Sequence, residues 1–157
     1  MSVRTRGTAT LGLMVLGLEA AGMPSVRALA TDAVVLLDGE VLLLERDHDP
    51  YEGAWVLPGG LVERGETARE ACVRETREEV GLEVRGVEFL GLFDAPGRDP
   101  RGNVSAAYRC EPVVEDAGPR PREEARSLET FPRDALPEMG FDHADVEIGR
   151  ASCRERV

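Results

Sequence analysis

Three glutamates near the middle of the chain have the types and spacing of a metal-dependent site. Glu75, Glu78 and Glu79 stand at i, i+3 and i+4, so on a helix their side chains leave one face together. Carboxylates this close repel one another unless a cation compensates their charge. Mg²⁺ prefers oxygen ligands and takes a few carboxylates together with substrate phosphate. The three acids therefore predict a site where a divalent cation meets a phosphate, with a solvated acidic helix face as the alternative.

A helix from Thr67 to Val80 is expected to position these acids. Its buried face is predicted from small and apolar residues at helical spacing, namely Ala68, Ala71, Cys72, Thr76 and Val80. Glu66 and Thr67 stand at the helix start, where a carboxylate or a hydroxyl can satisfy free backbone N–H groups. Gly81 falls where a left-handed C-terminal cap is wanted. Before the helix, the run Leu57-Pro58-Gly59-Gly60 predicts a glycine turn.

The fixed positions around the acids resemble the Nudix box of nucleoside diphosphate hydrolases. Residues 60–82 read GLVERGETAREACVRETREEVGL, and an apolar Leu82 closes the pattern. The matching positions are Gly60, Glu66, Arg74, Glu75, Glu78, Glu79 and Gly81. Seven fixed positions, each with a frequency of roughly one in fifteen, match by chance about once in 10^8 windows. Thr76 departs from the pattern, because the family prefers a bulky apolar residue there, although the methyl group of Thr can pack in its place.

The resemblance implies the Nudix fold, an α+β sandwich of the α/β/α type. In this fold a mixed β-sheet is flanked by helices, and the box forms a loop–helix–loop. The resemblance also implies a cofactor, Mg²⁺ with Mn²⁺ as the alternative. Its expected ligands are the Gly59 carbonyl, Glu75, Glu78 and Glu79.

The same resemblance separates catalytic from structural residues in the box. Glu75, Glu78 and Glu79 are the expected catalytic residues, with Glu75 or Glu79 as the general base and the loop acid Glu124 in reserve. The expected structural positions are Gly60, Glu66, Arg74 and Gly81. Arg74 is predicted to pair with Glu66 and so orient the loop over the helix; the alternative is an ordinary exposed ion pair, worth at most about 1 kcal/mol.

Three arginines outside the box are expected to bind the substrate. Arg46 ends a predicted strand, where an Arg of similar enzymes reaches the diphosphate. Arg98 and Arg101 flank Pro100 in the run RDPRG, which resembles the ADP-ribose pyrophosphatase branch of the family. The planar guanidinium fork suits bidentate phosphate recognition. The alternatives are a strand-end Arg that faces water and a loop ordered by Pro100 with a turn at Asp99.

The expected activity is hydrolysis of the pyrophosphate of a nucleoside diphosphate linked to another group, with ADP-ribose giving AMP and ribose 5-phosphate. One alternative is a nucleoside triphosphate pyrophosphatase that removes oxidised nucleotides, against which the RDPRG run argues. Another is a broader nucleotide-sugar or dinucleotide hydrolase. The last is a non-catalytic sensor of ADP-ribose; the presence of all three box acids and the lack of a basic helix-turn-helix pattern argue against it.

Several β-rich runs surround the predicted helix, which favours an α+β arrangement. The first two are separated by Asp38-Gly39, the dipeptide of a type I′ hairpin turn. The predicted strands are Arg27–Leu37, Val41–Arg46, Trp55–Leu57, Glu83–Phe93, Asn103–Val114 and Ser127–Phe131. Asp142 is expected to cap a last helix, and His143 to be structural. Trp55 is expected to pack against the box helix, with base stacking as the alternative.

The composition narrows the partners. The 157 residues carry a net charge of −11, which argues against a nucleic acid or an anionic membrane as a partner. All 19 basic residues are Arg, a pattern that fits both a GC-rich genome and an acidic, halophile-like surface adapted to salt. Three scattered cysteines favour no disulfide framework, so a reducing cytoplasm is the expected location. A small nucleotide is the expected ligand, and similar enzymes are often homodimers.

Residues 24–147 are expected to form a single domain, and both ends to lie outside it. Residues 1–23 carry Arg4 and Arg6 before the apolar run Leu11–Leu18. A misplaced start before Met23, a loose extension and a signal peptide are the interpretations of this segment. Residues 148–157 resemble a translated sequencing adapter, with a short native tail as the alternative.

Overall fold

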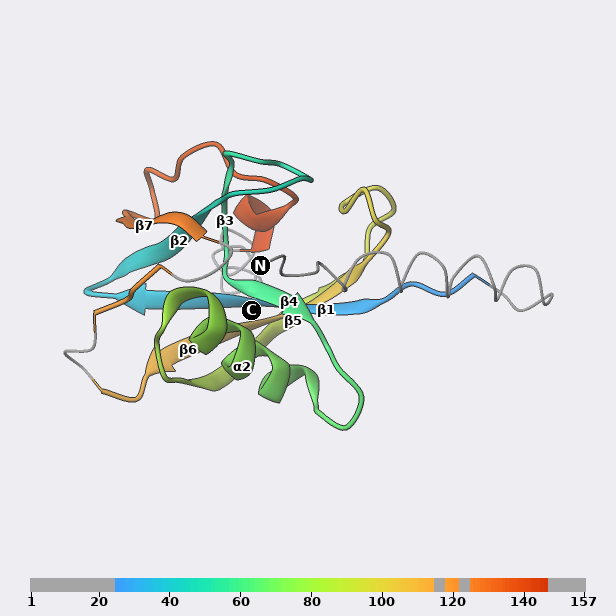
Figure 1. Cartoon of the computed structure of the whole chain (residues 1–157), viewed down its shortest axis with the longest axis horizontal. Coiled ribbons are helices and arrows are strands. Elements are labelled where there is room, and N and C mark those ends of the chain that lie inside the picture. The colour runs from blue at the N-terminus through green and yellow to red at the C-terminus, as the bar shows by residue number, and fades with distance from the viewer. Residues whose placement is uncertain (1–24, 115–117, 122–124, 147–157) are drawn as a thin grey trace, which may run out of the picture.

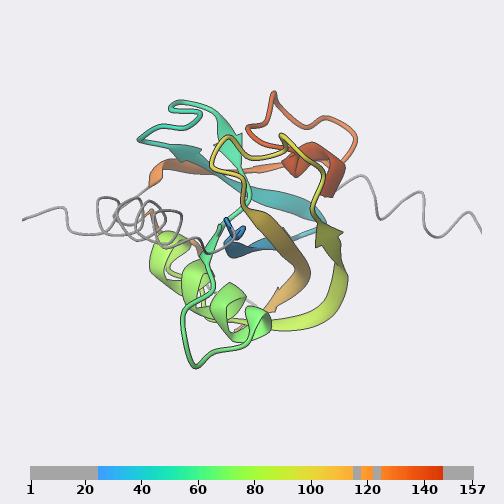
Figure 2. The same cartoon turned by 90° about the vertical axis from the view of Figure 1, so that its right-hand side faces the viewer.

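A mixed β-sheet with one long helix against it forms the part of the chain that the structure describes. The computed structural model describes residues 25–114, 118–121 and 125–146. Figure 1 shows α2 on one side of the sheet, and Figure 2 shows the segment 132–146 on the opposite side. The elements are β1 (Leu29–Leu37), β2 (Glu40–Arg46), β3 (Trp55–Val56), β4 (Gly59–Leu61), α2 (Ala68–Val80), β5 (Val84–Phe93), β6 (Val104–Pro112) and β7 (Ala125–Phe131).

Strand β1 is the centre of the sheet, whose main path runs β3-β2-β1-β6-β5. One edge of β1 is shared, because its C-terminal half pairs with β2 and its N-terminal half pairs with β4, both antiparallel. The other edge pairs with β6 in parallel. The turn between β1 and β2 has positive φ at Asp38 and at Gly39, 50° and 86°, which confirms the predicted type I′ hairpin.

The two faces of β1 belong to two apolar clusters. Ala33 and Val35 face α2 and pack with its buried residues, which include Cys72 and Val80. Val34 faces the other way, toward Val146 and the loop that precedes it. This alternation places a helix on one face of the sheet and the chain's C-terminal described segment on the other, as an α+β sandwich requires.

Two local predictions were wrong. The two glycines of the predicted turn in fact belong to strand β4, in which Gly59 pairs with Asp32 and Gly60 pairs with Thr31. A Cβ on Gly59 would lie 2.1 Å from the Thr31 carbonyl oxygen, so only glycine lets the two strands approach this closely. Trp55 does not pack against α2. Its ring meets the edge of Phe131 at 5.0 Å in the opposite cluster.

The expectations for residues 1–23, for Glu124, and for residues 148–157 fall outside the described residues. Within those residues, no helix combines the length and the apolar character that a membrane crossing demands. The cytoplasmic location, the homodimer, the salt adaptation and the bounds of the domain stay predictions.

Candidate active site

Helix α2 begins and ends as its sequence predicts. Thr67 is the N-cap: its hydroxyl accepts the N–H of Glu70, while the Glu70 carboxylate accepts the N–H of Thr67 at 2.7 Å. This reciprocal capping box satisfies two of the backbone donors at the helix start. Gly81 adopts a left-handed conformation with φ of 68° and donates its N–H to the Arg77 carbonyl. The helix therefore presents its acidic face in a fixed register.

Arg74 connects the acidic face of α2 to the loop before it. Its guanidinium donates to both carboxylate oxygens of Glu66, at 2.7 and 3.1 Å, and to the Leu61 carbonyl at 3.0 Å. The same group donates to Glu75 at 2.7 Å and to Glu78 at 3.2 Å. The predicted pair of Arg74 and Glu66 is thus present, as part of a larger network. These contacts tie the end of β4 to the middle of the helix.

The ion pair of Glu66 makes stability depend on pH. Hydrogen bonds, first from Arg74 and then from the backbone of Glu63, lower the pKa of Glu66 from 4.5 to about 2. A carboxylate with a depressed pKa stabilises the fold above its unfolded pKa and loses that contribution as the pH falls toward its folded pKa. We expect Glu66→Gln to lower the melting temperature near neutral pH, and the difference from the wild type to shrink as the pH falls below about 4.5.

Thermal unfolding followed by circular dichroism between about pH 7 and pH 3 measures this effect. Glu63→Gln, which changes an exposed side chain, is the matched control. A Glu66→Gln deficit that stays constant over the whole pH range would contradict the role of the Glu66 charge.

Two of the three predicted catalytic acids face strand β4. Glu79 accepts the N–H of Gly59 at 2.8 Å. Glu75 lies against Gly60, where an added Cβ would come within 2.4 Å of its carboxylate carbon. Glu78 is turned toward Arg74, and its side chain is 52% exposed. The structure therefore brings Glu75 and Glu79 to the backbone of Gly59 and Gly60, and leaves Glu78 largely exposed to solvent.

The donors fit a hard divalent cation in their chemistry. Glu75, Glu78, Glu79 and the Gly59 carbonyl offer only oxygen atoms, which is the ligand set that Mg²⁺ and Mn²⁺ accept. The missing side chain of Gly60 keeps the space beside the Glu75 carboxylate open. Within the described residues, however, no group of three or more acid, His or Cys side chains is already gathered as a metal site. Glu75 and Glu78 instead share the positive charge of Arg74.

The two glycines of β4 should respond differently to a methyl group. Gly60→Ala meets the far end of a flexible side chain, so we expect it to displace the Glu75 carboxylate and weaken cation binding while the fold persists. Gly59→Ala meets backbone atoms of β1, so we expect it to destabilise the fold by about 1–3 kcal/mol. Calorimetric titration with Mn²⁺ and chemical denaturation separate the two effects. Equal stability loss in both variants would contradict this distinction.

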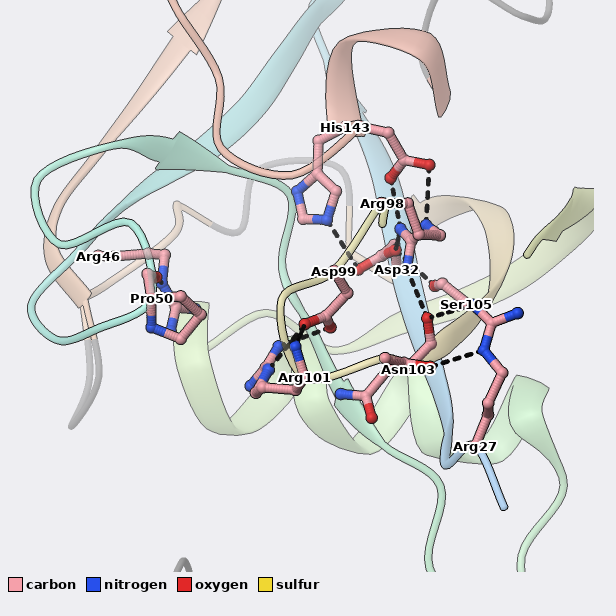
Figure 3. A network of polar contacts seen from close by, with 12 residues as sticks. Arg27, Asp32, Arg46, Pro50, Arg98, Asp99, Arg101, Asn103, Ser105 and His143 are labelled. Carbon is pink, nitrogen blue, oxygen red and sulfur yellow. Dashed lines mark hydrogen bonds and ion pairs between the residues drawn. The ribbon is translucent and has the colours of Figure 1, made fainter. Parts of the chain in front are cut away.

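A buried carboxylate that the sequence did not single out lies beside the glycine strand (Figure 3). Asp32 of β1 is 6% exposed and accepts a hydrogen bond from the Ser105 hydroxyl. His143 Nε2 lies 3.3 Å from the Asp32 carboxylate, and His143 Nδ1 accepts the Leu57 N–H at 2.9 Å. His143 therefore links the last helical turn to the entry of β4. The prediction that it is structural agrees with these contacts.

The environment of Asp32 keeps its carboxylate charged. Burial alone would raise its pKa, but His143, Ser105 and the positive charge of Arg98 outweigh burial and hold the pKa below its ordinary value. An acid in the middle of the apolar run LATDAVVLL was the available signal, because a buried charge needs a partner. That partner, His143, is 111 residues away in the sequence, so the pairing itself could not be predicted.

The structure separates the three arginines that were predicted to bind the substrate. Arg98 is turned inward, with its side chain 3% exposed, and it holds both carboxylate oxygens of Asp142. Asp99 accepts the N–H of Arg101 at 2.8 Å, which is the turn given above as the alternative. Arg98 is therefore a buried, ion-paired cation in this structure, and its predicted contact with the diphosphate stays a prediction. Asp142 precedes the helical turn at residues 143–146, and its carboxylate serves Arg98.

Arg46 and Arg101, in contrast, share one neighbour, the ring of Phe141. The guanidinium of Arg46 lies 5.5 Å and that of Arg101 5.4 Å from the centre of the Phe141 ring. Arg46 donates to the Pro50 carbonyl at 2.7 Å, and Arg101 pairs with Asp99 at 3.0 Å. The side chain of Arg101 is 50% exposed and can be reached from solvent.

The fold and the box define the class of the protein. The family model of the NUDIX domain matches residues 26–150, so the chain belongs to this family. Its similarity to pyrophosphatases of the family identifies it as a pyrophosphohydrolase. It is 38% identical over 119 residues to the ADP-ribose pyrophosphatase of Methanocaldococcus jannaschii, covering 76% of this chain and 70% of that protein.

Two further comparisons are informative. The chain is 30% identical over 119 residues to the NAD-capped RNA hydrolase NudC of Pseudomonas aeruginosa, which covers 75% of this chain but 41% of that protein. The crystal structure of a MutT/nudix family protein from Enterococcus faecalis superposes with a TM-score of 0.71 at 24% identity, over 96% of this chain and 71% of the other. This structural likeness shows the fold alone.

Proposed function

We propose that the chain hydrolyses ADP-ribose to AMP and ribose 5-phosphate in a reaction that depends on Mg²⁺. The observation that carries the proposal is the placement of Glu75 and Glu79 against the glycine backbone of β4. The similarity to an archaeal ADP-ribose pyrophosphatase over three quarters of the chain supports the choice of substrate. Arg46 and Arg101 both lie over the Phe141 ring and supply cations for a diphosphate.

The residues of the chain would divide the work as follows. The divalent cation would be held by Gly59, Glu75, Glu78 and Glu79. When bound, it neutralises charge on the phosphoryl group and makes a coordinated water more acidic.

Glu79 is the proposed general base. The Gly59 N–H orients one oxygen of its carboxylate, and the other oxygen is suited to take the proton of the attacking water. Glu75, the other candidate for the base, is engaged by Arg74. Arg74 compensates the charge of Glu75 and Glu78, and so keeps the acidic face ordered before a cation binds.

A dinucleotide is the second candidate substrate, because the chain also resembles an NAD-capped RNA hydrolase over 119 residues. The experiment is a panel of ADP-ribose, NADH and 8-oxo-dGTP, each with Mg²⁺, with Mn²⁺ and with a chelator, and with the products separated by chromatography. We expect the fastest turnover with ADP-ribose and no turnover in the chelator. Faster release of pyrophosphate from 8-oxo-dGTP would favour a triphosphate pyrophosphatase. Binding of ADP-ribose without any hydrolysis would favour a sensor.

A further inference from the structure

Two segments that are distant in the sequence, residues 46–51 and the loop with Arg101, meet at the ring of Phe141. Arg46 comes from the end of β2, Tyr51 from the loop that follows, and Arg101 from the loop between β5 and β6. The Tyr51 ring meets Phe141 edge to face at 4.7 Å, and the His143 ring stacks on Phe141 at 5.0 Å. Both guanidiniums lie within 5.5 Å of the ring centre. Phe141 is thus the common contact of the two cations proposed to bind the substrate.

The backbone at this meeting point is held in a conformation that aromatic residues seldom adopt. Phe141 has φ of 56° and Tyr51 has φ of 66°, in the left-handed region that favours glycine. Gly140 fits tightly beside them, since an added Cβ would lie 3.1 Å from Tyr51 Cβ and from Val56 Cγ1. Its N–H donates to the Trp55 carbonyl at 2.9 Å, which fixes the turn. Strain of this kind persists where the surrounding structure enforces it, and it is enriched at functional sites.

A short chain of contacts connects the ring to the box. Phe141 stacks on His143, and His143 accepts the N–H of Leu57, which lies two residues before Gly59. Gly59 in turn donates to the general base Glu79. Figure 3 shows Arg46 with Pro50, and Arg101 with Asp99, on the same side of the buried Asp32 network.

The like charges of Arg46 and Arg101 repel each other, so contacts around the Phe141 ring must hold both guanidiniums in place, and Asp99 compensates the charge of Arg101. The negative face of an aromatic ring attracts a guanidinium, and more strongly where water is partly excluded. Pro50 and Asp99 fix the other ends of the two groups at 2.7 and 3.0 Å. A diphosphate carries two adjacent anionic groups, and planar guanidinium forks match them well.

We propose that Phe141 is a positioning residue that holds Arg46 and Arg101 together as a clamp for the diphosphate of the substrate. This inference rests on the proposed function, because it assigns the clamp to the same site. The ring acts on binding through the two arginines and takes no part in bond cleavage. Its removal lets the cations separate and weakens the recognition of a diphosphate more than that of a monophosphate.

The test is calorimetric titration of the full chain with ADP and with AMP, in the presence of a chelator. We expect Phe141→Leu to weaken ADP binding about tenfold and AMP binding by less than threefold. Phe141→Tyr keeps the ring and should retain the affinity of the wild type. Phe89→Leu is the matched control, since the Phe89 ring is 52% exposed on β5 and touches neither arginine. With ADP-ribose as substrate, Phe141→Leu should raise KM and leave kcat within about twofold.

A second replacement covers the case in which Phe141→Leu does not fold. Pentafluorophenylalanine at position 141 keeps the shape of the ring and reverses the charge of its face. We expect it to weaken ADP binding as Leu does. Unchanged ADP affinity in a folded variant of either kind overturns the proposal, as does an equal loss in Phe141→Tyr. If the wild type binds ADP in a ring-dependent way but does not hydrolyse ADP-ribose, the clamp stands and the proposed substrate fails.

Discussion

Replacing Glu79 by glutamine is expected to reduce turnover of ADP-ribose by roughly a thousandfold, with little change in stability. The amide oxygen of Gln can still accept the N–H that Gly59 donates to Glu79 at 2.8 Å, so the local structure should persist. The amide, however, cannot take a proton from water at neutral pH, and it is a weaker ligand for a hard cation. Steady-state kinetics with product analysis measures the loss, and thermal unfolding checks the fold.

The matched control is Glu83→Gln, which removes an exposed carboxylate just after α2. It should leave both turnover and melting temperature near the wild-type values. Calorimetric titration with Mn²⁺ adds a second readout, because Glu79→Gln should also weaken binding of the cation. If Glu79→Gln keeps wild-type turnover, the base and the ligand are other groups, and Glu75 becomes the first to examine.

The parts of the fold that the sequence predicted well are those whose signals are local. The capping residue Thr67, the terminal Gly81 and the hairpin at Asp38-Gly39 each act within a few residues, and each takes its predicted conformation. The acids of the box could likewise be placed on one helix face from their spacing. Strand β4 was not predicted, because the need for glycine there comes from close packing against another strand and not from a local turn. A side chain on Gly59 would collide with the Thr31 carbonyl of β1.

The candidate site shows the same division. The sequence identified Glu75 and Glu79, but the contact of Glu79 with Gly59 and the sharing of Arg74 depend on how the loop folds back. Phe141 lies about 95 residues from Arg46 and 40 from Arg101, so no pattern in the chain could join the three. The run RDPRG indicated two equivalent arginines, but the side chain of Arg98 is buried and that of Arg101 is half exposed.

The contrast between Arg98 and Arg101 gives the second large prediction. Arg98→Met should destabilise the fold by about 3–5 kcal/mol, because it leaves buried carboxylates without their cation. The side chains of Asp142 and Asp32 are 19% and 9% exposed, and Arg98 lies within 3.7 Å of both. For a chain of this size we expect the melting temperature to fall by roughly 10 °C. Arg101→Met removes a half-exposed cation from the buried carboxylate of Asp99, which still accepts the backbone N–H of residue 101, so we expect a smaller loss of about 1–3 kcal/mol.

A double variant identifies the cause of the loss. Asp142→Asn added to Arg98→Met removes the carboxylate that Arg98 holds by both oxygens, so it should restore part of the stability. It should not restore all of it, since the buried Asp32 has still lost one of its partners. Binding of ADP gives the opposite order: Arg101→Met should weaken it, and folded Arg98→Met should not. If Arg98→Met is as stable as the wild type and loses ADP binding, Arg98 contacts the diphosphate, as its sequence motif first suggested, and the inward orientation is not the one that functions.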